Sequence, residues 1–283
     1  MAYCLIFPGQ GSQFPGMSRG LDLDRSIQGE LRALMENGPE DLLGETVNAQ
    51  PAILSVCAAL WERSGLTDPA AVLGHSLGEY TALVAAGCLT TSEAVRLVTK
   101  RAEFMDASRP RGEGCMAAVL GLAHEKVEQV VSGLPDLWVA NLNGASQVVI
   151  SGSARSMDAA APILREKGAK RLVPLKVSLA SHCPYMDRAR KDLGSYLEEI
   201  DLGTPRCPVI SNASAAAETE PGRIKSLLAD QLTHPVRFEE SVLEACSRGI
   251  DHFIEIGPRS VLAPLVRRIA PGVKVEVIAN DGH

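Results

Sequence analysis

The chain has 283 residues and a formal net charge of −6 at pH 7. Its hydrophobic fraction of 46% and charged fraction of 22% are those of a globular protein that can bury a core without disulfides or metals. The negative balance argues against a general nucleic-acid-binding protein, which needs a basic face to neutralise phosphates. No stretch reaches the roughly 18 apolar residues of a membrane helix, and the first residues lack the basic start of a secretory signal.

The seven cysteines are scattered along the chain and include no C-x-x-C pair. Their odd number and wide spacing disfavour both a disulfide framework and a metal site. We therefore expect them to be small core residues of a cytoplasmic protein. Cys183 directly follows a histidine, so it is kept as a minor rival for the role of nucleophile.

Strands and helices alternate through the first hundred residues. The pattern predicts strands at 2–7 and 70–74 and helices at 51–61, 79–88 and 91–107. Pro51 is expected at the first position of its helix, where a missing N–H is tolerated. Thr90 and Glu93 form a capping box before the last of these helices. Such alternation indicates a parallel sheet with crossover helices.

After a glycine- and proline-bearing turn at 109–114, the predicted order becomes β-α-β-β-α-β. The strands are expected at 116–120, 137–142, 147–151 and 171–177, and the helices at 125–131 and 154–167. Asn143-Gly144 supports a hairpin between the two middle strands. This order is typical of a ferredoxin-like unit. Alternation then resumes, with helices at 186–200, 223–232 and 238–248, strands at 208–211 and 252–256, and a helix after Gly257-Pro258.

We therefore predict an α/β fold with two domains. Residues 1–113 and 180–283 would form a large α/β-hydrolase-like domain with a parallel sheet. Residues 114–179 would form an inserted small ferredoxin-like (βαββαβ) domain.

The sharpest local signal is Gly74-His75-Ser76-Leu77-Gly78, a G-x-S-x-G pattern between a predicted strand and a predicted helix. A nucleophile elbow requires this context, because small residues let the chain turn tightly and present the Ser76 hydroxyl. The N–H of Leu77, at the start of the helix, can then donate to an oxyanion. A chance glycine-serine turn is the alternative, and the strand and helix flanks favour the nucleophile.

A serine nucleophile needs a base, and histidine is the usual one. His182 lies where the chain returns from the inserted unit, and a junction between domains is a common place for a cleft. On residue type alone, His182 is only a modestly better candidate for the base than His252 and His234. No acid is clearly placed to orient the base. Asp251 and Glu255 are candidates, and a backbone carbonyl can do the same work.

The loop around Gly9 and Gln10 follows the first strand. Its glycines permit close backbone approach to a ligand, and Gln10 offers amide donors. The spacing matches neither a dinucleotide loop nor a nucleoside-triphosphate loop. We expect an oxyanion donor across from Leu77, with a plain tight turn as the alternative.

Arg101 falls inside an apolar stripe on its predicted helix. The stripe is formed by Ala94, Leu97, Val98 and Met105. A buried arginine needs a partner, and its planar fork suits a carboxylate. A structural acidic partner and a ligand carboxylate fit the pattern equally well.

Six motifs that follow one another along nearly the whole chain match those of a known family. They are Phe-Pro-Gly-Gln-Gly-Ser-Gln at 7–13, Gly-His-Ser-Leu-Gly-Glu at 74–79, Lys-Arg-Ala-Glu-Phe-Met at 100–105, Ser-His-Cys at 181–183, Asp-Gln-Leu-Thr-His-Pro-Val at 230–236 and Glu-Ile-Gly-Pro at 255–258. The chain resembles the malonyl-CoA:acyl carrier protein transacylases, which include the fatty-acid enzyme and the discrete, trans-acting acyltransferases of polyketide synthases.

The resemblance implies a role for each matched position. Ser76 matches the nucleophile, His182 the base, Gln10 the oxyanion-hole residue beside the Leu77 N–H, Arg101 the arginine that pairs with the malonyl carboxylate, and Gln231 the glutamine whose backbone carbonyl orients the histidine. Gly9, His75, Asn141 and Asn143 are expected to line the substrate cleft.

The implied activity is transfer of malonyl from malonyl-CoA to the phosphopantetheine thiol of an acyl carrier protein, through an acyl-serine. We expect a cytoplasmic monomer that binds no metal or other cofactor, no nucleic acid and no membrane. A short stretch between Met17 and Gln50 and an alanine at 180 favour a polyketide over a fatty-acid pathway. The alternatives are an acyl hydrolase that clears stalled carrier proteins and a non-catalytic docking module.

Carrier proteins are usually acidic, so a local basic patch is expected despite the net charge. The possible contributors are Arg188, Arg190, Lys191, Arg267 and Arg268. Ordinary solvated charges are the alternative interpretation of each.

Overall fold

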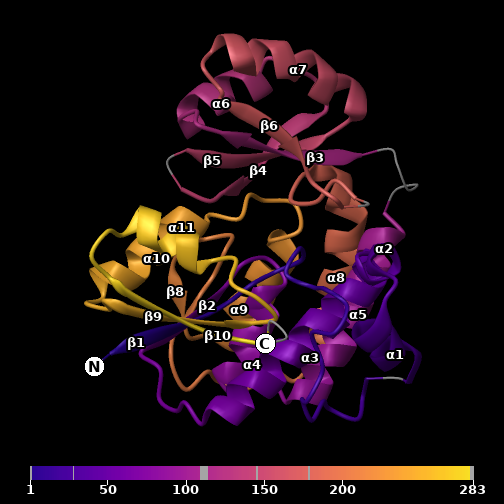
Figure 1. Ribbon diagram of the computed structural model, residues 1–283, viewed down its shortest axis with the longest axis vertical. Coiled ribbons are helices and arrows are strands. Elements are labelled where there is room, and N and C mark those ends of the chain that lie inside the picture. Colours follow the sequence, from indigo (N-terminus) through magenta and orange to yellow (C-terminus); the bar gives the residue numbers. More distant parts are fainter. Residues whose placement is uncertain (1, 28, 109–113, 145, 178, 281–283) are drawn as a thin grey trace.

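The computed structural model describes residues 2–27, 29–108, 114–144, 146–177 and 179–280. Figure 1 shows a larger part that holds both ends of the chain and a smaller part, made from the middle of the chain, above it. None of the helices in these ranges combines the length and apolar character needed to cross a bilayer. The predicted turn at 109–114 lies, apart from Gly114, outside the described residues.

The larger part is built from two stretches of the chain. The first contains β1 (Tyr3–Phe7), α1 (Gly29–Asn37), α2 (Glu40–Leu43), α3 (Thr46–Ser64), β2 (Ala71–Gly74), α4 (Gly78–Ala85) and α5 (Thr91–Asp106). After a 3₁₀ turn at Pro184–Met186, the second contains α8 (Asp187–Glu198), β7 (Val209–Ile210), β8 (Ala217–Glu218), α9 (Pro221–Asp230), α10 (Phe238–Ser247), β9 (His252–Gly257), α11 (Ala263–Ile269) and β10 (Lys274–Ala279).

The sheet of the larger part has the strand order β10-β9-β1-β2-β7-β8. Every neighbouring pair from β10 to β7 is parallel, and only β8 runs antiparallel to its neighbour. The predicted parallel sheet is therefore confirmed, with one antiparallel strand at its edge. The carboxyl ends of β1, β2, β7 and β9 share one edge, which is where open α/β sheets bind ligands.

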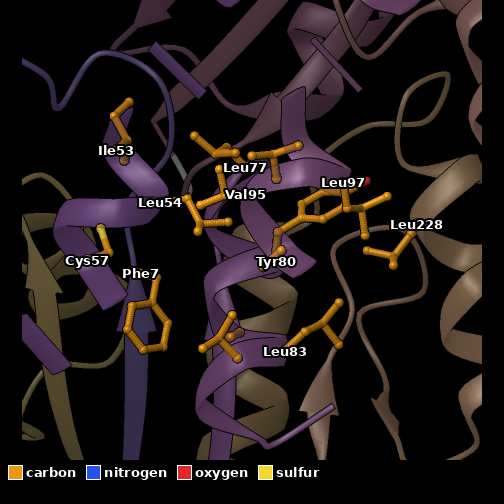
Figure 2. Packing of buried hydrophobic residues seen from close by; sticks show 14 of the residues in the cluster. Phe7, Ile53, Leu54, Cys57, Leu77, Tyr80, Leu83, Val95, Leu97 and Leu228 are labelled. Atoms are coloured by element: carbon orange, nitrogen blue, oxygen red, sulfur yellow. The ribbon is translucent and has the colours of Figure 1, made fainter. Parts of the chain in front are cut away.

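Helices cover both faces of this sheet and form two separate cores. One core packs α3, α4, α5, α8 and α9 against the sheet, and Figure 2 shows Phe7, Leu54, Tyr80 and Leu97 among its side chains. The other packs α10 and α11 against the opposite face, around Phe253. Every residue of α4 is buried, so the segment that follows the elbow is fixed on all sides.

The smaller part has the order β3 (Cys115–Leu120), α6 (His124–Val131), β4 (Leu137–Leu142), β5 (Gln147–Gly152), α7 (Ala154–Glu166) and β6 (Arg171–Pro174). Its four strands form an antiparallel sheet in the order β4-β5-β3-β6. Helices α6 and α7 cover one face, as Figure 1 shows. The predicted β-α-β-β-α-β order is confirmed for these residues.

Strand β3 alternates between two environments, as a strand with one face on each side must. Ala117 and Val119 pack under the helices, whereas Met116 and Ala118 face the other way.

The edge strand β4 joins the two parts of the molecule. Val236 of the larger part accepts from the N–H of Leu142 at 2.8 Å and donates to the carbonyl of Ala140 at 2.9 Å.

Two element predictions need correction. Pro51 does not begin its helix, because α3 starts at Thr46 and Pro51 lies inside it. Burial of Ala49 and Gln50 in the core keeps the preceding turn helical despite the hydrogen bond that proline lacks. The strand expected at 171–177 ends at Pro174. The N–H of Leu175 still donates to the carbonyl of Met116 at 2.9 Å, but the N–H of Val177 donates back to the carbonyl of Leu175, so the chain turns there and leaves the ladder.

Four elements were not predicted. Helix α2 and strand β8 are very short, helix α1 has only one buried residue, and β10 is a largely exposed edge strand. Elements with few buried residues show weak hydrophobic periodicity, so these four could not be recognised from the hydrophobic pattern.

Candidate active site

Ser76 lies in the turn between β2 and α4, with a φ of +51°. Close contacts explain both glycines of the pattern. A Cβ on Gly74 would lie 1.9 Å from the carbonyl carbon of Gly78, and one on Gly78 would lie 2.0 Å from the carbonyl oxygen of Phe7. The strand–turn–helix predicted here is confirmed, and it places the serine at the carboxyl edge of the sheet.

The Ser76 hydroxyl lies 2.9 Å from Nε2 of His182. Nδ1 of His182 lies 2.7 Å from the backbone carbonyl oxygen of Gln231. A carbonyl can only accept, so the proton sits on Nδ1 and the lone pair of Nε2 faces the serine. Burial, with the nearby charge of Arg101, lowers the pKa of His182 to about 3. The ring is therefore neutral near pH 7 and can take a proton.

Arg101 is only 1% exposed, so the apolar stripe correctly predicted its burial. Its Nη1 donates to Oε1 of Gln50 at 2.8 Å, and its Nη2 donates to Oε1 of Gln231 at 2.9 Å and to the Ser76 hydroxyl at 3.3 Å. Within the described ranges no carboxylate forms an ion pair with it. A buried cation without a contacting anion, beside a serine hydroxyl, can take an anionic ligand.

The side chain of Gln10 does not point where an oxyanion donor should. Its Nε2 donates to the carbonyl of Gly44 at 3.1 Å. The backbone N–H groups of Gln10 and Leu77, in contrast, make no hydrogen bond to any described residue, and both residues line the cleft. The expected donor pair is therefore available from two backbone N–H groups, not from the glutamine amide. Gly9 allows this approach, since a Cβ there would lie 2.5 Å from the carbonyl oxygen of His75.

The cleft has a volume of about 250 Å³ and lies between the two parts of the molecule. From the larger part it is lined by Gly9, Gln10, His75, Ser76, Leu77, Arg101 and His182 among others, and from the smaller part by Met116, Ala118, Asn141, Asn143, Val149, Leu175 and Val177. His75 and Asn143 join the two sides, with Nε2 and Oδ1 at 2.8 Å. All the site residues predicted from the sequence, except Gln231, therefore meet in one cleft, and Gln231 lies directly behind it.

A family model described as acyl transferase domain matches residues 4–279. The chain belongs to this acyl transferase family. A malonyl CoA-acyl carrier protein transacylase of Bacillus subtilis (strain 168) is 42% identical over 294 residues, which cover 97% of this chain and 92% of that protein. The acyl-carrier-protein S-malonyltransferase structure from Burkholderia pseudomallei 1710b has a TM-score of 0.93 at 37% identity, covering 98% of this chain and 96% of that one.

A third acyl transferase bears on partners. It is the malonyl-transacylase solved in complex with its type II polyketide synthase acyl carrier protein. Its TM-score is 0.92 at 33% identity, and the match covers 98% of this chain and 96% of that one. The architecture described above is thus that of solved malonyltransferases, with a mostly parallel sheet and a separate antiparallel one.

The rival residues considered from the sequence lie elsewhere in this acyl transferase. Cys183 is 1% exposed, and its thiol donates to the carbonyl of Ala180. His234 contacts the carbonyl of Asp230, and His252 lies beside Glu276. In the described part of the chain no disulfide joins any of the cysteines, and no group of three or more potential ligand side chains is placed there to hold a metal.

Neither candidate acid contacts His182. Glu255 accepts hydrogen bonds from the N–H groups of residues 261–263, and Asp251 is exposed. The acceptor beside Nδ1 of His182 is instead the backbone carbonyl of Gln231, at 2.7 Å.

Sequence reasoning missed Asn212, which lies just after β7. Its Oδ1 accepts from the N–H of Ser76 at 2.6 Å, and its Nδ2 donates to the carbonyl of Gly74 at 2.6 Å. These contacts hold the backbone of the elbow. They span 136 residues of sequence, and no local pattern marks the asparagine. Its place after a short buried strand at the carboxyl edge is the only signal that could have suggested it.

Proposed function

We propose that this acyl transferase moves a malonyl group from malonyl-CoA to the phosphopantetheine thiol of an acyl carrier protein, through an acyl-serine. One observation carries the proposal. The hydroxyl of Ser76 has the base His182 at 2.9 Å on one side and the buried guanidinium of Arg101 at 3.3 Å on the other. A nucleophile and a carboxylate-binding group thus lie within the length of a malonyl unit.

In the first half-reaction the hydroxyl of Ser76 gives its proton to Nε2 of His182 and attacks the thioester carbonyl of malonyl-CoA. The N–H groups of Leu77 and Gln10 donate to the oxyanion that forms. The carbon–sulfur bond then breaks, and His182 returns the proton to the CoA sulfur. Malonyl-Ser76 and free CoA result.

The second half-reaction uses the same groups in reverse. The phosphopantetheine thiol gives its proton to Nε2 of His182 and attacks the ester carbonyl of malonyl-Ser76. The Leu77 and Gln10 N–H groups again donate to the oxyanion. The carbon–oxygen bond breaks, Ser76 regains its proton from His182, and malonyl leaves on the carrier sulfur.

Arg101 accounts for the choice of donor. The free malonyl carboxylate would pair with its guanidinium, whereas an acetyl group would leave that buried charge without an anion. Gly9, His75, Asn141 and Asn143 would line the path of the thioester, because all four lie along the cleft. An editing hydrolase has less use for such an arginine, and the relatives named above are transferases.

We infer the domain limits from the same arrangement. Residues 1–113 and 180–283 would make an α/β-hydrolase-like catalytic domain, and residues 114–179 a ferredoxin-like insert. The strand order β4-β5-β3-β6 supports the second assignment. The elbow between β2 and α4 supports the first.

The carrier protein would dock at the mouth of the cleft. Of the basic residues considered, Arg268 contacts a residue that lines the cleft, since its guanidinium donates to Oε1 of Gln147 at 3.0 Å. Arg190 is paired with Asp230 at 2.6 Å, which offsets its charge. We propose a cytoplasmic monomer that needs no bound metal or cofactor. A polyketide pathway is favoured by the short stretch from Met17 to Gln50 and by Ala180.

The test is an intact-mass measurement of the protein mixed with malonyl-CoA or acetyl-CoA, followed by addition of a phosphopantetheinylated carrier protein. A lasting malonyl adduct that passes to the carrier, with little adduct from acetyl-CoA, is expected. Free malonate with no lasting adduct would instead establish a hydrolase. Binding of the carrier with no acyl transfer at all would establish a docking module.

A further inference from the structure

Glu79 is a buried carboxylate with no role in the mechanism above. It lies in the first turn of α4, three residues after the nucleophile, and is 1% exposed. Its Oε2 accepts from the backbone N–H of Asn212 at 3.0 Å and from Nε2 of Gln231 at 2.8 Å. A buried carboxylate is tolerated only where hydrogen bonds and nearby charge compensate its desolvation. These two contacts therefore indicate that Glu79 has a role at the site.

The two residues that Glu79 contacts hold the rest of the site. Asn212 accepts from the N–H of Ser76. The side chain of Gln231 donates to the carbonyl of Ser76 at 3.1 Å and accepts from Arg101 at 2.9 Å. Both backbone groups of Ser76, and the guanidinium beside it, are therefore held by side chains of two residues that Glu79 contacts, Asn212 through its backbone N–H and Gln231 through its amide.

The carboxylate of Glu79, at 2.8 Å, is the nearer of two acceptors that orient the Gln231 amide, and the carbonyl of Ser76 at 3.1 Å is the other. An ionised carboxylate can only accept hydrogen bonds, so the amide nitrogen must face Glu79. The amide oxygen is then left to face Arg101, which can only donate. Gln231 thus links a buried anion to a buried cation that have no direct contact. Burial raises the pKa of Glu79 to about 7, against the opposing donors from Asn212 and Gln231 and the charge of Arg101.

We propose that Glu79 is a positioning residue for donor selection: through Gln231 it holds Arg101 beside Ser76, and so sets the preference for thioesters that carry a free carboxylate. This inference rests on the proposed malonyl transfer. Without the anion, the amide nitrogen of Gln231 keeps only the Ser76 carbonyl, at 3.1 Å, as an acceptor, so the orientation that presents oxygen to Arg101 is held less firmly. The guanidinium would then be less well fixed by Oε1 of Gln231 and less well placed for the malonyl carboxylate.

A merely structural role for Glu79 makes a different prediction. Looser packing around α4 would lower the folded fraction or slow acylation by every donor alike. The ratio of the malonyl rate to the acetyl rate would then stay constant. That ratio therefore separates positioning from structure.

The experiment compares Glu79→Gln with the wild type at pH 8, where the native carboxylate is ionised. Single-turnover acylation rates are measured by quenched intact mass with malonyl-CoA and with acetyl-CoA. We expect the malonyl-to-acetyl rate ratio to fall at least tenfold in Glu79→Gln. Thr81→Val is the matched control, because Thr81 is buried on the same helix and its hydroxyl has no partner among the described residues. Its ratio should equal that of the wild type.

A second variant keeps the test decisive if Glu79→Gln folds poorly. Gln231→Ala removes the linking amide but keeps the backbone carbonyl that orients His182. We expect it to lower the ratio as Glu79→Gln does, and the double variant to lower it little further, because both changes break one path. An unchanged ratio in either single variant, or additive effects in the double one, would overturn the inference. A wild-type protein that takes up no malonyl would instead overturn the proposed function.

Discussion

The two walls of the cleft differ in how their side chains are held. We call Ser76, Leu77, Arg101, His182 and the Gln10 loop the floor, and the apolar side chains Met116, Ala118, Val149, Leu175 and Val177 the roof. On the floor, hydrogen bonds fix the nucleophile, the base and the guanidinium. The roof consists of the second face of a small sheet, whose other face is buried under helices, together with Leu175 and Val177 just after β6. The floor residues therefore hold the reacting groups in place, whereas the roof residues set the size and shape of the space above them.

The largest expected effect comes from the floor. Arg101→Ala should lower the rate of acylation by malonyl-CoA about 100-fold or more, because truncating one partner of a buried, charge-assisted contact costs about 3 kcal/mol or more. Acylation by acetyl-CoA should fall far less. Single-turnover mass spectrometry measures both rates, and Arg96→Ala, on the exposed face of the same helix, is the control. An equal fall with both donors would contradict the assignment of Arg101 to the carboxylate.

A substitution at Gly78 in the elbow should lower the stability of the fold, because the added side chain has no room. Gly78→Ala would place a Cβ 2.0 Å from the Phe7 carbonyl oxygen, so α4 must move, and we expect a loss of about 3 kcal/mol or more in the free energy of unfolding. Denaturant unfolding measures it. Gly222→Ala, where a new Cβ meets nothing within 4 Å, should change the stability by less than about 1 kcal/mol. Similar losses in both variants would show that the close contact is not what requires glycine.

The buried base makes stability depend on pH. The folded pKa of His182, about 3, lies below the ordinary value near 6.5, so only the unfolded chain takes up this proton as the pH falls below about 6.5. The stabilisation is present above that pH and is lost as the pH falls toward 3. Between pH 7.5 and 5 the wild type should lose about 2 kcal/mol more than His182→Gln. Urea unfolding of both proteins at the two pH values measures the difference.

In that comparison other groups cancel, because both proteins keep them. They include His75, whose pKa burial lowers, and Glu79, whose pKa burial raises. Parallel changes in the two proteins would show that His182 is not the group responsible.

The smallest expected effect comes from the roof. Met116→Ala removes apolar volume from the cleft and no hydrogen-bond donor to the substrate, so malonyl acylation should change less than about tenfold. A bulkier, branched malonyl donor should gain relative to malonyl, because extra space favours it. Competition between the two CoA thioesters, read by mass, measures this. A loss as large as that of Arg101→Ala would erase the distinction between floor and roof.

Sequence reasoning succeeded where the signal is local. The elbow glycines, the capping box at Thr90 and the buried stripe around Arg101 each lie within one turn or one helix. It failed where contacts are made between distant segments. Asn212 reaches Ser76 from the turn after β7, and the amide of Gln10 donates to the carbonyl of Gly44, 34 residues away. The role of the Gln231 carbonyl is implied only by the resemblance, since no residue type marks a backbone acceptor.

The most direct measurement is the intact mass of Ser76→Ala and Cys183→Ala after incubation with malonyl-CoA. The account predicts no malonyl adduct on Ser76→Ala and a full adduct on Cys183→Ala, because the cysteine is buried against Ala180 while the serine faces the cleft. An adduct that persists in Ser76→Ala, or disappears in a folded Cys183→Ala, would contradict the assignment of Ser76 as the residue that carries the acyl group.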